Sequence, residues 1–128
     1  TNVRLVQLIE AEGAPWDFTM LGDSRTYADL VTPEGLEEIA GYADGIGPDK
    51  RLILPVDAAG RSGTPTALVG DAHAAGLLVH PWTFRSEDQY LPLEFRGNPA
   101  AEIRAFLALG VDGVFADFPD VAVAARGR

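Results

Sequence analysis

The chain has 128 residues, of which 47% are hydrophobic and 23% charged, a composition typical of a folded domain rather than of a disordered segment. Its 19 acidic and 10 basic residues give a formal net charge of −9, which argues against nucleic acid or an anionic membrane as partner, because both require clustered Lys and Arg. It has no cysteine, so disulfides, thiolate metal sites and cysteine nucleophiles are excluded.

The chain begins with a predicted strand, which is followed by a long irregular segment. Residues 3–9 form an apolar, β-branched run of the kind found in strands that are buried on both faces of a parallel sheet. Residues 10–31 show no clear period and are interrupted by Gly13, Pro15 and Gly22, so we expect a strand-to-helix loop insertion there. Loops of this length usually carry function.

Three helices are predicted by a recurring proline, each preceded by a residue whose side chain can cap a helix: Thr32-Pro33, Thr64-Pro65 and Asn98-Pro99. The helices are expected at 33–42, 65–75 and 99–109. Gly76 and Gly110 end the second and third helices, because only glycine enters the left-handed conformation at little cost.

Each predicted helix is followed by an apolar run that indicates a strand, at 44–48, 77–82 and 111–116. A short terminal helix begins at 117–120, and residues 52–55 could be a loop strand or a buried crossover. Together with the first strand, these runs make four strands, each followed by a helix. This repeat predicts an α/β protein with parallel strands, either a barrel or an open sheet.

Three segments, 42–49 (YADGIGPD), 78–85 (LVHPWTFR) and 110–120 (GVDGVFADFPD), resemble glycerophosphodiester phosphodiesterases, especially the extracytoplasmic bacterial type. With residues 6–8 they cover nearly the whole chain in the family's order. Family members are (β/α)8 TIM barrels. The resemblance therefore implies that residues 1–128 are a single partial domain, the C-terminal half of a barrel with its last four strand–helix units and parallel strands.

The resemblance also implies an activity: hydrolysis of glycerophosphodiesters to glycerol 3-phosphate and an alcohol. A divalent cation, Ca²⁺ or Mg²⁺, would be held by carboxylates, and two histidines would act as general acid and base. The family's motifs for these groups, His-Arg-Gly, Glu-x-Asp with His-Asp, and Glu-x-Lys, lie in its first three strands and are absent from this sequence. His73 and His80 stand in other contexts, so we expect no catalytic residue and no metal ligand on this chain, and no activity from it alone.

Substrate contacts are expected where strands of such a barrel end, at Gln7, Trp82, Arg85 and Phe115. The Trp82 ring could cover the apolar face of a glycerol unit while its N–H meets an oxygen, or the residue could be a core aromatic. Arg85 could bind a phosphodiester oxygen, although an ion pair in solvent is the commoner arrangement. Phe115 could line the same wall or fill the barrel interior.

Five other polar residues have structural interpretations. We expect His80 to be a hydrogen-bonded structural group, His73 to face water or a loop, and Asp112 to serve a turn at the opposite end of its strand. Asp49 fits a solvated surface charge. Asp117 could face substrate or metal, or accept N–H groups at the start of the terminal helix.

Half a barrel exposes two sheet edges and an apolar inner face, which is costly in water. We therefore expect an N-terminal half barrel as partner, from the same precursor or as a separate chain, and a small-molecule glycerophosphodiester as ligand. The start at Thr1 has neither an initiator Met nor a signal-peptide pattern and is expected to be a cut edge. No apolar run approaches the roughly 18 residues of a membrane span.

Two alternatives stay open. One is a non-catalytic half-barrel module that binds a polyol or phosphate; the other is an unrelated TIM-barrel enzyme whose phosphate group lies near the last two strands. The resemblance favours an extracytoplasmic location, periplasmic or secreted, which the residues themselves do not decide.

Overall fold

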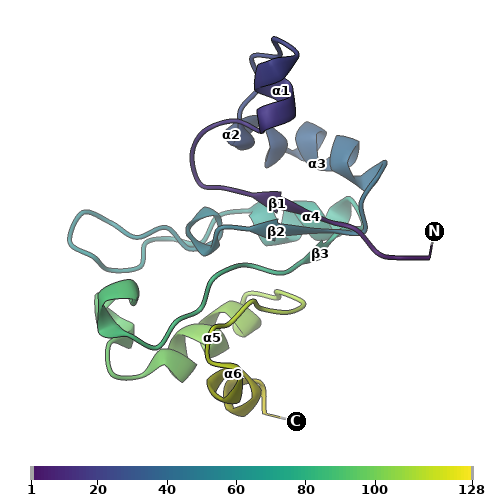
Figure 1. Cartoon of the computed structure of the whole chain (residues 1–128). Helices are drawn as coiled ribbons and strands as arrows, with labels where there is room; N and C mark the ends of the chain where they lie inside the picture. Colours follow the sequence, from purple (N-terminus) through teal and green to yellow (C-terminus); the bar gives the residue numbers. More distant parts are fainter. Residues whose placement is uncertain (1, 128) are drawn as a thin grey trace.

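The computed structural model describes residues 2–127, and three parallel strands form its centre (Figure 1). The strands are β1 (Val6–Ile9), β2 (Gly45–Pro48) and β3 (Leu78–Val79), in the order β1-β2-β3. In the register, Val6 pairs with Gly45 and Gly45 with Leu78. The predicted α/β class with parallel strands is therefore confirmed.

Helices connect and follow the strands. The α-helices of the described residues are α1 (Trp16–Met20), α2 (Tyr27–Leu30), α3 (Pro33–Ala40), α4 (Leu68–Ala74), α5 (Pro99–Ala108) and α6 (Pro119–Arg126). Short 3-10 turns are η1 (Lys50–Leu52), η2 (Asp88–Tyr90) and η3 (Leu93–Phe95). Among residues 2–127, no helix combines the length and the apolar character needed to cross a bilayer.

Two of the three predicted helix starts are confirmed. Thr32 accepts a hydrogen bond from the Gly35 N–H at α3, and Asn98 accepts one from the Ala101 N–H at α5. The prediction for α4 is wrong, because this helix begins three residues after Pro65, at Leu68. Residues 64–66, which were expected to begin this helix, lie outside it.

Instead, residues 64–66 contact the segment that follows β2. The Thr66 hydroxyl donates to the carbonyl oxygen of Leu52 at 2.6 Å, and the Thr66 N–H donates to that of Ile53 at 2.8 Å. These bonds hold residues 64–66 out of the helix. Both predicted helix-ending glycines, Gly76 and Gly110, have positive φ angles of 82° and 100°.

The excursion at 10–31 contains more structure than the predicted loop, since α1 and α2 lie within it. The Thr26 N–H donates to the Asp29 carboxylate at 2.8 Å, which fixes the first turn of α2. Residues 52–55 do not form the predicted strand; η1 ends at Leu52, and Ile53 and Leu54 are buried, in keeping with the alternative of a buried crossover. Val56 and Ser62 make an isolated antiparallel bridge beyond this segment.

The last two predicted strands are shorter than expected. Pro81 has no N–H to donate, and β3 ends at Val79. Residues 111–116 still run parallel beside the chain that follows β3, as the bridge between Phe84 and Ala116 shows, and the Phe115 N–H donates to the Pro81 carbonyl at 3.0 Å. The fourth strand is thus present as hydrogen-bonded extended chain rather than as a regular strand.

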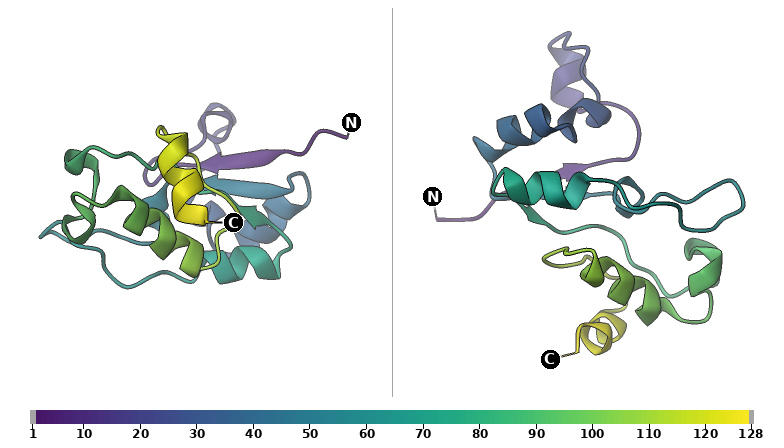
Figure 2. Two further views of the ribbon diagram at one scale, coloured as in Figure 1. Left: turned by 90° about the horizontal axis from the view of Figure 1, so that it is seen from below. Right: turned by 180° about the vertical axis from the view of Figure 1, so that it is seen from behind.

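Within residues 2–127, helices cover one face of the sheet and leave the other open. In Figure 1 the strands lie in front of α4, and in the view from behind α4 lies in front of them (Figure 2). Ile9, Ile46 and Val79 are fully buried on the covered face. Along β1 the alternate residue Leu8 is 55% exposed, so the prediction that this strand is buried on both faces is wrong for the described residues.

Candidate functional site

A hollow of about 670 Å³ lies where the strands end, and we call it the strand-end cavity. It is lined by Gln7, Leu8, Glu10, Tyr27, Trp82, Thr83, Phe115, Ala116 and Asp117. Three of the four residues expected to contact substrate, Gln7, Trp82 and Phe115, are therefore brought together although they are far apart in sequence. The carboxyl end of parallel strands is where α/β proteins bind their ligands.

Trp82 is held in place by the neighbouring strand. Its indole N–H donates to the Gly47 carbonyl oxygen at 2.6 Å, and its backbone N–H donates to the Pro48 carbonyl oxygen at 3.1 Å. The peptide bond between Trp82 and Thr83 is cis. Because the indole N–H is engaged within the protein, the expectation that it meets a ligand oxygen has no support in this structure, and a contact between Trp82 and substrate stays a prediction.

Phe115 forms part of the cavity wall rather than filling a core, since it is 46% exposed. The His80 ring meets it edge-on, with the ring centroids 6.4 Å apart. Beneath His80 lies Gly113, where a Cβ atom would come within 3.1 Å of the imidazole. The imidazole forms no hydrogen bond with residues 2–127, so His80 is placed by packing and not by the hydrogen bond we expected.

Gln7 lines the cavity, but both ends of its amide are occupied. The Tyr42 hydroxyl donates to Gln7 Oε1 at 2.9 Å, and Gln7 Nε2 donates to the Leu8 carbonyl oxygen at 3.0 Å. Each end of the Gln7 amide nevertheless keeps one further hydrogen-bonding position, since the oxygen can accept two bonds and the NH2 group can donate two.

Arg85 does not line the strand-end cavity. Its guanidinium lies over the Tyr90 ring, 3.9 Å from the centroid, and forms contacts of 3.3 Å with the carboxylates of Glu87 and Asp117. The arginine is thus ion-paired, the commoner of the two arrangements considered from sequence. Asp117 belongs to the strand-end cavity, so this contact joins Arg85 to its edge.

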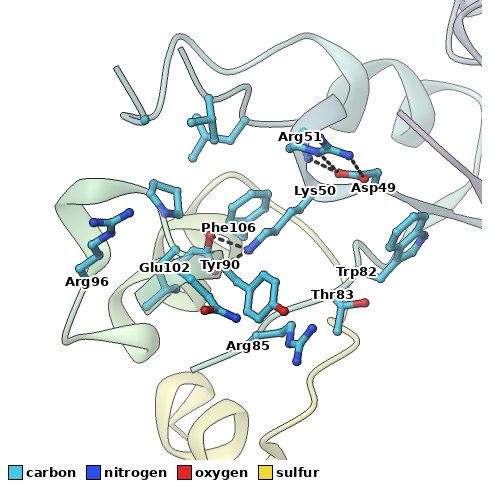
Figure 3. Close-up of a pocket in the computed structure, with 16 residues that line it drawn as sticks. Asp49, Lys50, Arg51, Trp82, Thr83, Arg85, Tyr90, Arg96, Glu102 and Phe106 are labelled. Atoms are coloured by element: carbon cyan, nitrogen blue, oxygen red, sulfur yellow. Dashed lines mark hydrogen bonds and ion pairs between the residues drawn. The ribbon is translucent and has the colours of Figure 1, made fainter. Parts of the chain in front are cut away.

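A second hollow of about 520 Å³ lies between the loop after β2 and helix α5, and we call it the cation-lined hollow (Figure 3). It shares Trp82 and Thr83 with the strand-end cavity. Its basic residues are Lys50, Arg51, Arg85 and Arg96, and its acidic residues are Asp49 and Glu102.

Two ion pairs form the inner wall of the cation-lined hollow. Lys50 Nζ lies 2.9 and 3.0 Å from the carboxylate oxygens of Glu102, whose side chain is 1% exposed. Burial raises the pKa of Glu102, and the Lys50 ammonium opposes that rise. Asp49 accepts hydrogen bonds from the backbone and the guanidinium of Arg51 and is 7% exposed. The interpretation of Asp49 as a solvated surface charge is therefore wrong.

At the opposite end of the sheet, Asp112 has the structural role expected of it. Its carboxylate accepts hydrogen bonds from the Val79 N–H at 2.9 Å and from His73 Nε2 at 2.8 Å. Although partial burial favours the neutral carboxyl, these hydrogen bonds hold the pKa of Asp112 below its ordinary value. His73 is exposed, as expected, and its ring also binds the Asp112 carboxylate.

Residues 2–127 bring together no group of three or more His, Asp or Glu side chains that could hold a metal ion. The side chains described here therefore do not fit a divalent cation, and the source of its ligands stays a prediction.

The residue that sequence reasoning missed is Glu102. It lies one turn before Phe106 on α5, next to Ile103, and all three are buried. An acidic residue within the apolar stripe of a predicted helix is the signal that could have revealed it, because buried carboxylates require a cationic partner.

Comparisons with known proteins agree with this geometry. The model of the glycerophosphoryl diester phosphodiesterase family matches residues 1–121. The chain is 45% identical over 105 residues to glycerophosphodiester phosphodiesterase GDPD6 of Arabidopsis thaliana, covering 80% of this chain and 28% of that protein. It is 30% identical over 135 residues to a glycerophosphodiester phosphodiesterase of Treponema pallidum (strain Nichols), covering 99% of this chain and 36% of that protein. The chain thus spans little more than a third of these relatives at most.

Proposed function

Because the chain belongs to the glycerophosphoryl diester phosphodiesterase family, we propose that it is the C-terminal half of a metal-dependent (β/α)8 barrel enzyme. The enzyme would hydrolyse glycerophosphodiesters to glycerol 3-phosphate and an alcohol. The observation that carries this proposal is the strand-end cavity, which lies where ligands bind in parallel α/β proteins and is lined by Trp82 and Phe115.

The half-barrel interpretation is supported by the way the sheet is covered. Three strands and the extended chain at 111–116 follow one another in parallel order. Val6 and Leu8 project from the uncovered face and are 38% and 55% exposed. An apolar sheet face of this kind is unfavourable in water, and a second half barrel would cover it.

The role proposed for this chain is to bind and orient the substrate. The Trp82 ring face and Phe115 would pack against the carbons of the glycerol unit. The Thr83 hydroxyl, which forms no hydrogen bond with residues 2–127, and the Asp117 carboxylate would receive its hydroxyl groups. When bound, the cation would polarise the phosphodiester; its ligands are proposed to come from the N-terminal half.

A reconstitution experiment tests the proposal. The chain is assayed alone and together with an N-terminal half barrel from the family, and release of glycerol 3-phosphate from glycerophosphocholine is measured with and without a chelator. We expect release only from the reconstituted barrel and its loss on chelation. Release of glycerol 3-phosphate by this chain alone would overturn the proposal that the N-terminal half supplies the cation ligands. Tight binding of glycerol 3-phosphate without turnover of any diester would favour the non-catalytic module instead.

A further inference from the structure

The cation-lined hollow gathers positive charge in an acidic chain. Four of the chain's 10 basic residues line it, whereas the formal net charge of the chain is −9. The basic side chains of this lining outnumber its acidic ones, Asp49 and Glu102, so the hollow is less repulsive to an anion than the molecule as a whole.

Among residues 2–127, one of these four cations, Arg96, has no carboxylate partner. Lys50 is paired with Glu102, and Arg51 with Asp49. The Arg96 side chain forms no hydrogen bond or ion pair with any of residues 2–127. Arg85 is ion-paired with the carboxylates of Glu87 and Asp117, each at 3.3 Å, although its buried Nε atom forms no hydrogen bond within the described chain. Arg96 is therefore the cation in the hollow that an anionic group could bind without displacing a carboxylate.

Neutral donors lie beside these cations. The side chains of Thr83, Gln89 and Tyr90 line the hollow and form no hydrogen bond with residues 2–127. Figure 3 shows Tyr90 projecting into the space between the Lys50–Glu102 pair and Arg85. Hydroxyl and amide groups of this kind bind the hydroxyl groups of a polyol, and guanidinium groups bind phosphate.

We propose that the cation-lined hollow binds the alcohol portion of the diester and selects alcohols that carry hydroxyl groups and a second phosphate. The hollow adjoins the strand-end cavity through Trp82 and Thr83, so one ligand can reach from the glycerol position into it. This inference rests on the proposed function of the strand-end cavity. Arg96 supplies charge to the second phosphate, while Gln89 and Tyr90 meet the hydroxyl groups of the alcohol.

The test is a calorimetric titration with three probes: myo-inositol 1-phosphate, myo-inositol and inorganic phosphate. The chain is used in the form that circular dichroism shows to be folded, alone or with its N-terminal half, and a chelator is present throughout. We expect the inositol phosphate to bind at least about tenfold more tightly than either other probe, because it engages both kinds of donor. Arg96→Gln should weaken its binding about tenfold.

Arg104→Gln is the matched control. Arg104 lies on the exposed side of α5, lines neither hollow and undergoes the same change of charge. Equal losses in the two variants would mean that the effect is general electrostatics and would overturn the proposal. So would equal affinity for inorganic phosphate and inositol phosphate, which describes an anion site without polyol selection.

The proposed function and this inference fail separately. If the reconstituted barrel hydrolyses glycerophosphocholine but the inositol phosphate does not bind, the inference about the hollow is wrong and the proposed function stands. If the inositol phosphate binds as expected and no diester is hydrolysed, the proposed function is wrong and the hollow remains a site for phosphorylated polyols.

Discussion

The two faces of the sheet differ in what their side chains contact. On the covered face, Ile9, Ile46 and Val79 have no exposed surface and pack against helices. On the open face, Leu8 and Phe115 are about half exposed and line the strand-end cavity. The comparison teaches that stability and ligand contact are placed on opposite sides of the same strands, so substitutions should separate the two properties.

The largest difference between the two faces is expected when a large apolar side chain is replaced by alanine. Ile46→Ala should lower the free energy of unfolding by about 3 kcal/mol, because it leaves a cavity in the covered face. Leu8→Ala, on the open face, should lower it by less than about 1 kcal/mol. Urea denaturation of both variants measures the contrast, and similar losses would show that the open face is covered in the protein.

A smaller effect is expected from the tryptophan that the two hollows share. Trp82→Ala should raise the KM for a glycerophosphodiester about fivefold in the reconstituted barrel, because an aromatic contact contributes roughly 1 kcal/mol. Trp82→Phe keeps a ring and loses only the indole hydrogen bond to Gly47, so its KM should stay near that of the unaltered protein. Steady-state kinetics decide: a Phe variant as impaired as the Ala variant would mean that the indole N–H contacts the substrate.

The smallest effect is expected on stability, from Asp112 at the end of the sheet opposite the strand-end cavity. Its folded pKa lies below the ordinary value of 3.8, so its ionised form stabilises the fold above pH 3.8, and this contribution is lost as the pH falls through the folded pKa. Asp112→Asn should therefore be less stable than the unaltered protein near neutral pH, and the difference should shrink in acid.

Thermal unfolding across this pH range measures the stability difference between Asp112→Asn and the unaltered protein. Asp120→Asn, at an exposed position on α6, serves as control. A stability difference that stays constant down to strongly acidic pH would contradict the role assigned to the Asp112 hydrogen bonds.

Features that depend on near neighbours in sequence were predictable. The caps at Thr32 and Asn98 and the left-handed glycines Gly76 and Gly110 act within a single turn, and all four are present. The same reasoning failed at Thr64 because Thr66 bonds to Leu52, a partner that the local pattern does not reveal.

The candidate site, too, could be predicted from the sequence only in part. That Trp82 and Phe115 lie together followed from placing both at strand ends, which the helix–strand repeat indicates. What their polar neighbours contact did not follow, since the Trp82 indole meets Gly47 and the buried Glu102 meets Lys50 across 52 positions of sequence. Contacts of that range depend on how the helices lie against the sheet.

Lys50 links parts of the molecule that are otherwise distant. Its backbone N–H donates to the Trp82 carbonyl oxygen at 2.9 Å, and its ammonium group binds Glu102 on α5. A shift of α5 along the sheet would therefore pull on the residue that anchors the tryptophan. Lys50 thus joins helix α5 to the backbone of Trp82, the residue that both hollows share.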